Sequence, residues 1–193
     1  MKPSTTRSKE ATHERIVEAG ARAIRRCGYH GIGIADIMKQ AGLTHGGFYA
    51  HFTSREAMLA ELADRAGADA IATFLRLTAA VPAEHSLLAL LRAYLSKAHV
   101  KNPEVGCPIA GLGTEMPRQT AAVRRAATHR IKEMIDVVSR QSADWGQPGA
   151  HERALATVAT MVGAVVLARA VDEDPLSESV LQAALEHLTA EAP

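Results

Sequence analysis

The chain has 193 residues and a formal net charge of +1, and 4% of its residues are aromatic. Alanine is abundant and no run alternates polar and apolar residues over the length of a strand, so the composition excludes a β-rich fold and favours helices. The two cysteines offer no disulfide framework and the N-terminal residues contain no apolar run of a signal peptide, so we expect a cytoplasmic protein.

Two helices are predicted before Gly42. The first runs from about residue 9 to 27 and places small and apolar side chains on one face. The second runs from Ile34 to Ala41, where apolar residues recur at i, i+3, i+4 and i+7. Gly42 follows at the position where a residue in the left-handed conformation ends a helix.

A third, short helix from Thr44 to about His51 completes a helix-turn-helix motif. Thr44 is placed to N-cap it, and the glycine before it allows the tight turn that this motif uses. Gly46 and Gly47 together destabilise such a helix by roughly 2 kcal/mol relative to alanine. That loss makes sense where the backbone must lie close to a partner, and the second helix of the motif enters the major groove of DNA. The segment therefore predicts DNA binding.

Six further helices are predicted towards the C-terminus. The fourth begins at Thr53 or Ser54, where Thr53 and Glu56 make a capping box, and continues to about residue 81. The others cover about residues 83–99, 109–116, 118–142, 151–171 and the segment from Asp174 onwards, where Pro175 suits the first turn. The sequence thus predicts an all-α fold of about nine helices, with a DNA-binding domain over residues 1–55 and a second helical domain over residues 56–193.

The charges are distributed unevenly along the chain. Nine Lys and Arg stand against four Asp and Glu in residues 1–55, whereas residues 151–193 carry two against seven. A basic first domain suits a partner rich in phosphate, although a chance gradient on a solvated surface is the alternative. The most apolar stretch, residues 154–168, is shorter than the roughly 18 to 20 residues of a membrane span, so no membrane partner is expected.

An enzyme is the rival class, and the sequence gives it little support. It contains neither an H-E-x-x-H zinc motif nor a G-x-S-x-G nucleophile elbow. His99, Cys107 and Glu115 are too irregularly spaced for a metal site. We therefore expect no catalytic residue, metal or cofactor. A helical scaffold that binds only protein is a third class, but it would not need a glycine-rich third helix.

About residues 10 to 60 resemble the N-terminal DNA-binding domain of TetR/AcrR-type transcriptional regulators. The matching residues, in order and with the family's spacing, are Arg15-Ile16, Ala19, Gly28-Tyr29, Ile37, Ala41-Gly42, Gly46, Phe48-Tyr49, His51-Phe52 and Ser54-Arg55-Glu56. Three positions depart from the pattern: Gly33 replaces the usual Ser or Thr cap, Gly47 a side chain that often contacts a base, and His45 a frequent Lys.

The motif and the resemblance together imply one set of DNA-contacting residues: Thr44, His45, Gly46, Gly47, Tyr49, Ala50, His51 and Arg55. Thr44 and Arg55 are suited to phosphate and His45 to a base edge or phosphate. For Tyr49, half-buried packing is the alternative, and for His51 a solvated position without a role. The basic residues Lys2, Arg7 and Lys9 either add DNA contacts or form a merely solvated tail.

The resemblance implies two tasks for the second domain, effector binding and dimerisation. Candidates to line the effector pocket are Phe74, Tyr94, Cys107, Leu112, Met116, Met134, Trp145 and Met161, most of which would equally serve as plain core. Candidates for an interface that pairs the last two helices with those of a second subunit are Val158, Val162, Val166, Leu181 and Leu185. The alternative is that these two helices only cover the core of their own subunit.

Cys107 has two interpretations. The stretch GCPIAGLGTEMPRQTAAVRRA resembles a subgroup of these regulators with a Gly-Cys-Pro segment, some of which sense electrophiles or oxidants through this cysteine. A helix begins directly after it, and its N-terminal dipole would lower a thiol pKa. A buried, inert side chain is the alternative. The sequence therefore predicts a homodimeric repressor released from a palindromic operator by a small molecule, or alternatively by reaction at Cys107, while activation in place of repression stays open.

Overall fold

The computed structural model describes residues 5–190, and within that range the chain forms helices and no strand. The all-α prediction is therefore confirmed. The α-helices are α1 (Thr5–Cys27), α2 (Ile34–Gln40), α3 (Arg55–Ala79), α4 (Ser86–Tyr94), α5 (Lys97–Lys101), α6 (Ile109–Leu112), α7 (Ala121–Gln141), α8 (Ala150–Ala170) and α9 (Asp174–Ala190). Four short 3-10 segments join them: η1 (His45–Ala50), η2 (Ala83–His85), η3 (Pro103–Val105) and η4 (Met116–Arg118).

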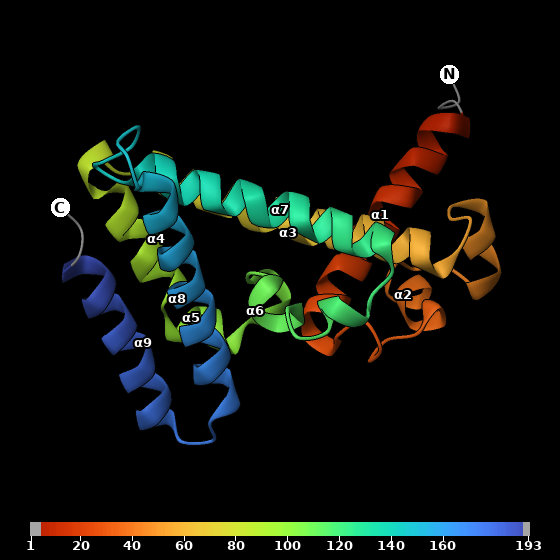
Figure 1. Cartoon of the computed structure of the whole chain (residues 1–193). Coiled ribbons are helices and arrows are strands. Elements are labelled where there is room, and N and C mark those ends of the chain that lie inside the picture. Colours follow the sequence, from red (N-terminus) through yellow and green to blue (C-terminus); the bar gives the residue numbers. More distant parts are fainter. Residues whose placement is uncertain (1–4, 191–193) are drawn as a thin grey trace.

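The two long helices α3 and α7 pack side by side and form the axis of the molecule (Figure 1). The helices α1 and α2 gather with η1 around the N-terminal half of α3, and α4, α8 and α9 lie at the opposite end (Figure 1). Two apolar cores follow from this arrangement. One joins α1, α2, η1 and α3 as far as Ala66, and the other joins α4, α7, α8 and α9 with the second half of α3 from Phe74 onwards.

The N-terminal core extends beyond residue 55. Met58, Leu59 and Leu62 of α3 are fully buried in it, and so are Leu112 of α6 and Val123 of α7. We therefore propose that residues 1–55 form a domain which the first half of α3 completes, so that this helix belongs to both halves of the molecule.

Local hydrogen bonds explain where the helices end and begin. Gly42 has a φ of +72°, and its N–H and that of Leu43 bond the carbonyls of Lys39 and Met38 at 3.0 and 2.9 Å, which closes α2 as predicted. Of the two predicted starts of α3, Ser54 takes the N-cap position, and its hydroxyl accepts the N–H of Ala57 at 3.0 Å.

The predicted helix over residues 83–99 is broken into three pieces. Leu95 leaves the helical conformation, with a φ of −86° and a ψ of 53°, and the hydroxyl of Ser96 then caps α5 by accepting the N–H of His99 at 3.2 Å. A serine that bonds the backbone in this way offers the chain an alternative to a continuous helix.

The helix α8 matches the helix predicted over about residues 151–171 and extends beyond the apolar stretch 154–168 at both ends. It has 21 residues and is long and apolar enough, by length and composition alone, to cross a membrane, a test that the core helix of a soluble protein also passes. Its side chains Met161 and Val165 are fully buried in the second core.

Candidate nucleic-acid interface and internal cavities

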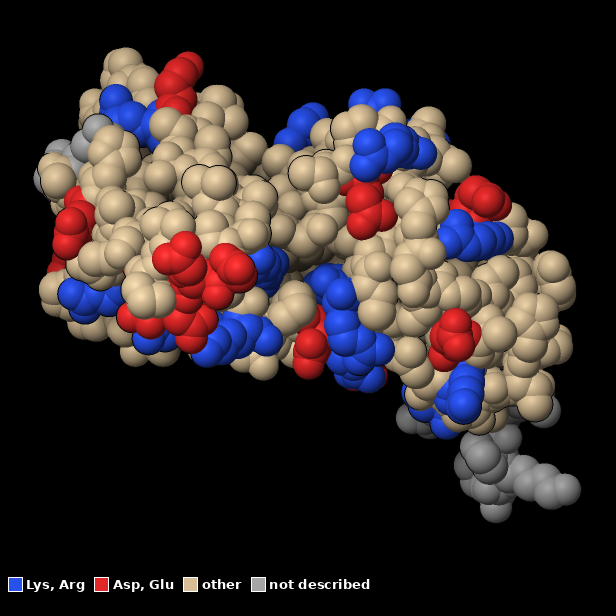
Figure 2. All heavy atoms as spheres, turned by 90° about the horizontal axis from the view of Figure 1, so that it is seen from below, with Lys and Arg blue, Asp and Glu red and all other residues tan. Residues whose placement is uncertain are grey.

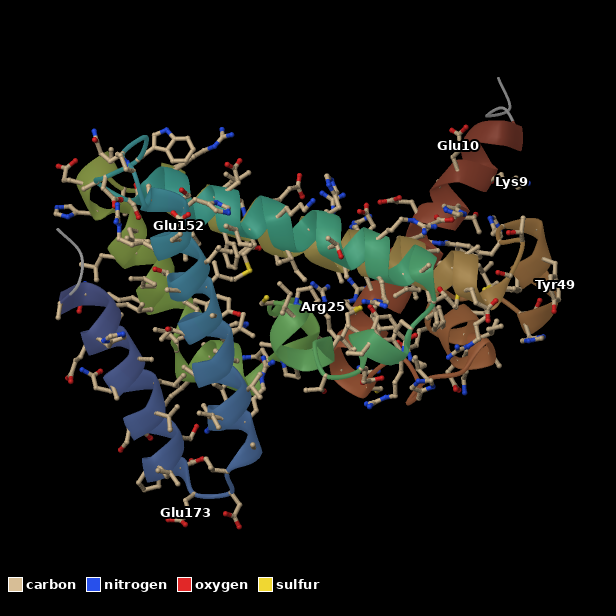
Figure 3. All side chains as sticks on the ribbon, in the orientation of Figure 1. Lys9, Glu10, Arg25, Tyr49, Glu152 and Glu173 are labelled. Carbon is tan, nitrogen blue, oxygen red and sulfur yellow. The ribbon has the colours of Figure 1, made fainter. Side chains whose placement is uncertain are left out.

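The segment η1 forms the far end of the molecule. Tyr49 projects from this end, and its side chain is 74% exposed (Figure 3). Phe48 and Phe52 point the other way into the core, with stacked rings whose centroids lie 5.5 Å apart. Thr44, His45, Gly46 and Ala50 are all exposed beside Tyr49. The apolar anchors thus hold a short, exposed strip of chain away from the rest of the subunit.

Nothing within the subunit explains the glycines of this strip. A Cβ built on Gly46 would meet no atom within 4 Å, and one on Gly47 would make an ordinary contact of 3.5 Å with Cε of Met38. Neither residue has a positive φ. Because neither packing nor backbone conformation demands glycine here, the bare backbone is best explained by close approach to something outside the subunit.

The third element of the motif is a 3-10 helix and not the predicted α-helix. Its bonds connect residues three apart, from the N–H of Gly47 to the carbonyl of Thr44 at 3.1 Å and from that of His51 to Phe48 at 2.9 Å. A segment of six residues with two glycines stabilises an α-helix poorly, which explains the tighter form. Thr44 stands at the N-cap position, but its hydroxyl makes no capping bond, contrary to the prediction.

His51 and Arg55 are half-buried and are held by their own domain. The imidazole of His51 lies 5.9 Å from that of His13, and its buried Nδ1 finds no partner among the described residues. Burial, followed by the charges of His13 and Lys9, lowers the pKa of His51, so this ring is neutral at pH 7. Nη2 of Arg55 donates to the carbonyl of Tyr29 at 2.7 Å. Both therefore contribute to the shape of the motif as well as being candidate DNA contacts.

The basic N-terminal arm is described only in part. The side chain of Lys9 is exposed on α1, whereas Lys2 and the side chain of Arg7 lie outside the described residues. At the other end, exposed carboxylates gather over the turn between α8 and α9, where Figure 2 shows the largest group of acidic side chains: Asp172, Glu173, Asp174 and Glu178. The acidic end therefore lies far from η1, as the uneven charge along the chain suggested.

Sequence reasoning missed a junction between the two halves of the molecule. The N–H of Tyr29, in the turn after α1, donates to Oε2 of Glu115 at 3.1 Å. The partners stand 86 positions apart, so no local pattern pairs them. Arg25 crosses the same junction and bonds Asp69 on α3 at 3.3 Å (Figure 3). The backbone of Tyr29 is thus bonded twice. Its carbonyl accepts from Arg55, the first residue of α3, and its N–H donates to Glu115.

A cavity of about 210 Å³ lies between α3, α6 and α7. Four of the predicted effector residues line it: Phe74, Cys107, Met116 and Met134. Tyr94 lines a neighbouring cavity of about 270 Å³ that shares Phe74 and Cys107. Leu112 and Met161 are core residues, and Trp145 is 52% exposed on the loop before α8, so none of these three lines either cavity.

Cys107 is buried, as one of its two interpretations predicted. The backbone amides of Ile109 and Ala110 at the start of α6 do lower the pKa of its thiol, as does the Tyr94 hydroxyl, but burial outweighs them and raises it. The N–H of Cys107 donates to Nε2 of His99 at 3.0 Å, which fixes the segment. The thiol is therefore protonated at neutral pH.

The predicted dimer residues divide into two groups. Val158 and Leu181 are buried in the core of their own subunit, so they offer little surface to a partner. Val162, Val166 and Leu185 are half-buried. The outward face of α8 instead presents Leu155 and Leu167, which are 43% and 57% exposed, with small residues between them: Ala159 and Gly163.

Comparisons with known proteins agree with this geometry. A family model described as bacterial regulatory proteins of the tetR family matches residues 16–62. The HTH-type transcriptional regulators Rv0196 and MT0206, from two strains of Mycobacterium tuberculosis, are each 31% identical over 168 residues, which cover 83% of this chain and 85% of theirs. Both relatives carry the name of a transcriptional regulator.

Solved structures share the fold over nearly the whole chain. A TetR regulator from Chloroflexus aurantiacus is 28% identical, with a TM-score of 0.77 and 95% of each chain covered. The reduced form of E. coli NemR is 21% identical, with a TM-score of 0.79 and 95% of this chain and 98% of that chain covered.

Proposed function

The chain belongs to the TetR family of bacterial regulatory proteins, and we propose that it is a repressor which a small molecule releases from a palindromic operator. It is a DNA-binding transcriptional regulator, and we place it in the cytoplasm, where the DNA lies. The observation that carries the proposal is the bare, outward strip of η1, where Gly46 has open space on its side-chain face and no positive φ.

The exposed side chains around this strip suit a major groove. The free hydroxyl of Thr44 and the tip of Tyr49 can bond phosphate oxygens, while His45 and Ala50 face outward as contacts for base edges. Gly46 and Gly47 let the backbone approach the groove, and Arg55 and His51 support the motif from its inner side. A second copy, paired through the outward faces of α8 and α9, would present the same strip to the other half of a palindrome.

The second half of the molecule offers the effector site. The cavities beside Phe74 and Cys107 both border α3, the helix that belongs to both cores. An effector that binds one arrangement of the subunits better than another shifts the dimer towards it. We infer that the favoured arrangement does not fit the operator, so that binding relieves repression.

Reaction at Cys107 is the second candidate for release. Its support is that the thiol borders both cavities, but burial keeps it protonated and the nucleophile is the thiolate. We expect Cys107→Ser to leave DNA binding intact in either case. An electrophile such as N-ethylmaleimide that still releases DNA from this variant would exclude the thiol as the sensor.

The proposed function is tested by selection from random double-stranded DNA, followed by affinity titration of the enriched sequence at rising salt. We expect a palindrome, and an affinity that falls by about 10³-fold or more between 50 and 200 mM salt if six or more phosphates are contacted. Failure to enrich any sequence, or a salt-independent affinity, would contradict the proposal.

A further inference from the structure

The residues that line the cavity of about 210 Å³ include Tyr29, a residue of the N-terminal core. Its remaining walls come from α3, α7 and the segment around α6, through residues such as Phe74, Met116 and Met134. The cavity thus adjoins the turn after α1 directly, and whatever fills it touches the part of the chain that carries the DNA-binding motif.

The walls offer no free charge. Arg130 is the one charged residue among those that line the cavity, and Nε and Nη2 of its guanidinium bond both oxygens of Asp64 at 2.8 and 2.6 Å, while Nη1 bonds Glu133 at 2.7 Å. Burial holds the Cys107 thiol and the Tyr29 phenol in their neutral forms by raising the pKa of each. A charged ligand would therefore find no counter-charge there.

Tyr29 lines the cavity, and its hydroxyl lacks a partner in the described part of the chain. The side chain is fully buried, and its oxygen has no hydrogen-bond partner among the described residues. A buried hydroxyl left unbonded is unfavourable, and a ligand atom in the cavity can satisfy it. The volume is also informative, because a dry cavity of about 150 Å³ holds one benzene ring, whereas drug-sized ligands need about 300 Å³ or more.

We propose that this cavity binds a small, neutral, mainly apolar effector of about one ring, whose oxygen accepts a hydrogen bond from the Tyr29 hydroxyl. That the bound molecule acts as an effector rests on the proposed function, whereas the presence of the binding site does not. The ligand class follows from the size of the cavity, its apolar walls, its neutralised Arg130 and its one unbonded hydroxyl.

Two probes of matched shape test the site on the full chain without DNA. Acetophenone carries a carbonyl oxygen, and cumene carries a methyl group in its place. Tyr29→Phe removes only an unbonded hydroxyl and is expected to fold, while Ala127→Leu fills the cavity from α7. Binding is measured by calorimetry, with thermal unfolding as the check on folding.

We expect the wild type to bind both probes, and Tyr29→Phe to lose about five- to tenfold in affinity for acetophenone with cumene unchanged, since one hydrogen bond is lost. Ala127→Leu is expected to lose both. No binding by the wild type would overturn the site, and equal losses for both probes in Tyr29→Phe would overturn the role of the hydroxyl.

DNA affinity is measured separately with the selected sequence. Acetophenone is expected to weaken DNA binding by the wild type and not by Ala127→Leu. If the probes bind but DNA affinity does not change, the site is not the effector site. If the chain selects no DNA at all, the regulator proposal fails while the cavity result stands.

Discussion

Gly46 and Gly47 give η1 a face without side chains, and this face is where the structure leaves the chain uncovered. A subunit optimised only for its own stability would carry alanine at both positions, because glycine loses more conformational freedom on folding than any other residue. We therefore expect that binding, and not stability, determines the residue at both positions.

Gly46→Ala is expected to separate the two properties. The variant should unfold at a temperature about 1 to 4 °C higher, since a compatible Gly to Ala change stabilises by about 0.4 to 1 kcal/mol. Its affinity for the selected DNA should fall roughly tenfold or more, because the added methyl group must be forced into a close contact.

Thermal unfolding and fluorescence anisotropy measure the two effects on one sample. The slope of affinity against salt should stay unchanged, since no phosphate-binding cation is removed. An alanine variant that binds DNA as well as the wild type would show that the backbone of η1 does not meet the groove.

His99 fixes the backbone before Cys107 through two hydrogen bonds that require its imidazole to be neutral. Its Nδ1 donates to the carbonyl of Tyr94 at 2.7 Å, and its Nε2 accepts the N–H of Cys107 at 3.0 Å, an assignment that only the neutral ring allows. Burial lowers the pKa of His99 and the charge of Arg169 lowers it further, while the bond to Tyr94 offsets part of this.

The free energy of unfolding should therefore decrease as the pH is lowered into the acid range. Because the pKa of His99 is lower in the folded chain than its unfolded value near 6.5, the unfolded state binds more protons below about pH 6.5, and stability declines as the pH drops. His99→Gln keeps one donor and one acceptor, so its unfolding free energy should lose less between pH 7 and 5. Denaturant titrations at several pH values measure this, and an identical decline would contradict the assigned role.

Among the elements, helix identity was predictable and local conformation was not. Apolar spacing located α2, α3, α7 and α8 to within a few residues, because their buried faces repeat over several turns. The break at Leu95 and the 3-10 form of η1 depend on the balance between one serine cap or two glycines and their tertiary surroundings. No periodicity carries that information.

The outward face of α8, which is the predicted dimer interface, was likewise not predictable in detail from the sequence. The sequence identifies an apolar helix, but rotation about its axis decides which residues face outward, and Val158 turned out to face inward where Leu167 faces out. Leu167→Glu should keep the subunit folded, since the side chain is 57% exposed in it. It should weaken the dimer by about a hundredfold or more, because the symmetric interface loses two buried leucines and gains two charges.

Sedimentation equilibrium measures the dissociation constant of the dimer. Titration with the selected DNA measures how a weaker dimer changes DNA affinity. Val158→Glu is the contrast, because it places a charge in the core and should unfold the subunit itself. A Leu167→Glu variant that remains fully dimeric would show that the outward face of α8 is not the interface.

In the whole molecule, the contact between Glu115 and Tyr29 connects the cavity segment to the DNA-binding motif. Together with the bond from Arg55 to the Tyr29 carbonyl, it connects the turn after α1 both to the start of α3 and to the segment that follows α6. Sequence reasoning could predict two domains, but not this connection, because it joins side chain and backbone across the fold and leaves no periodic trace.

Glu115→Ala is expected to uncouple the two halves. Acetophenone should bind about as well as to the wild type, but its effect on DNA affinity should shrink towards none, because the carboxylate no longer holds the Tyr29 amide. Glu115→Gln retains an acceptor oxygen and serves as the matched control, with coupling close to that of the wild type. Paired DNA titrations with and without the probe measure the coupling, and undiminished coupling in the alanine variant would contradict this role.

Because α3 runs unbroken through 25 residues and both cores, it acts as a lever about 37 Å long. A pivot of about 5° at its middle swings each end by about 1.5 Å, given a rise of 1.5 Å per residue. In a two-fold pair the two tips would swing apart together, by about 3 Å against a helical repeat of about 34 Å. A tilt that small would change little within one subunit. In the dimer it would move one DNA-binding motif out of register with its major groove while the other stays in place.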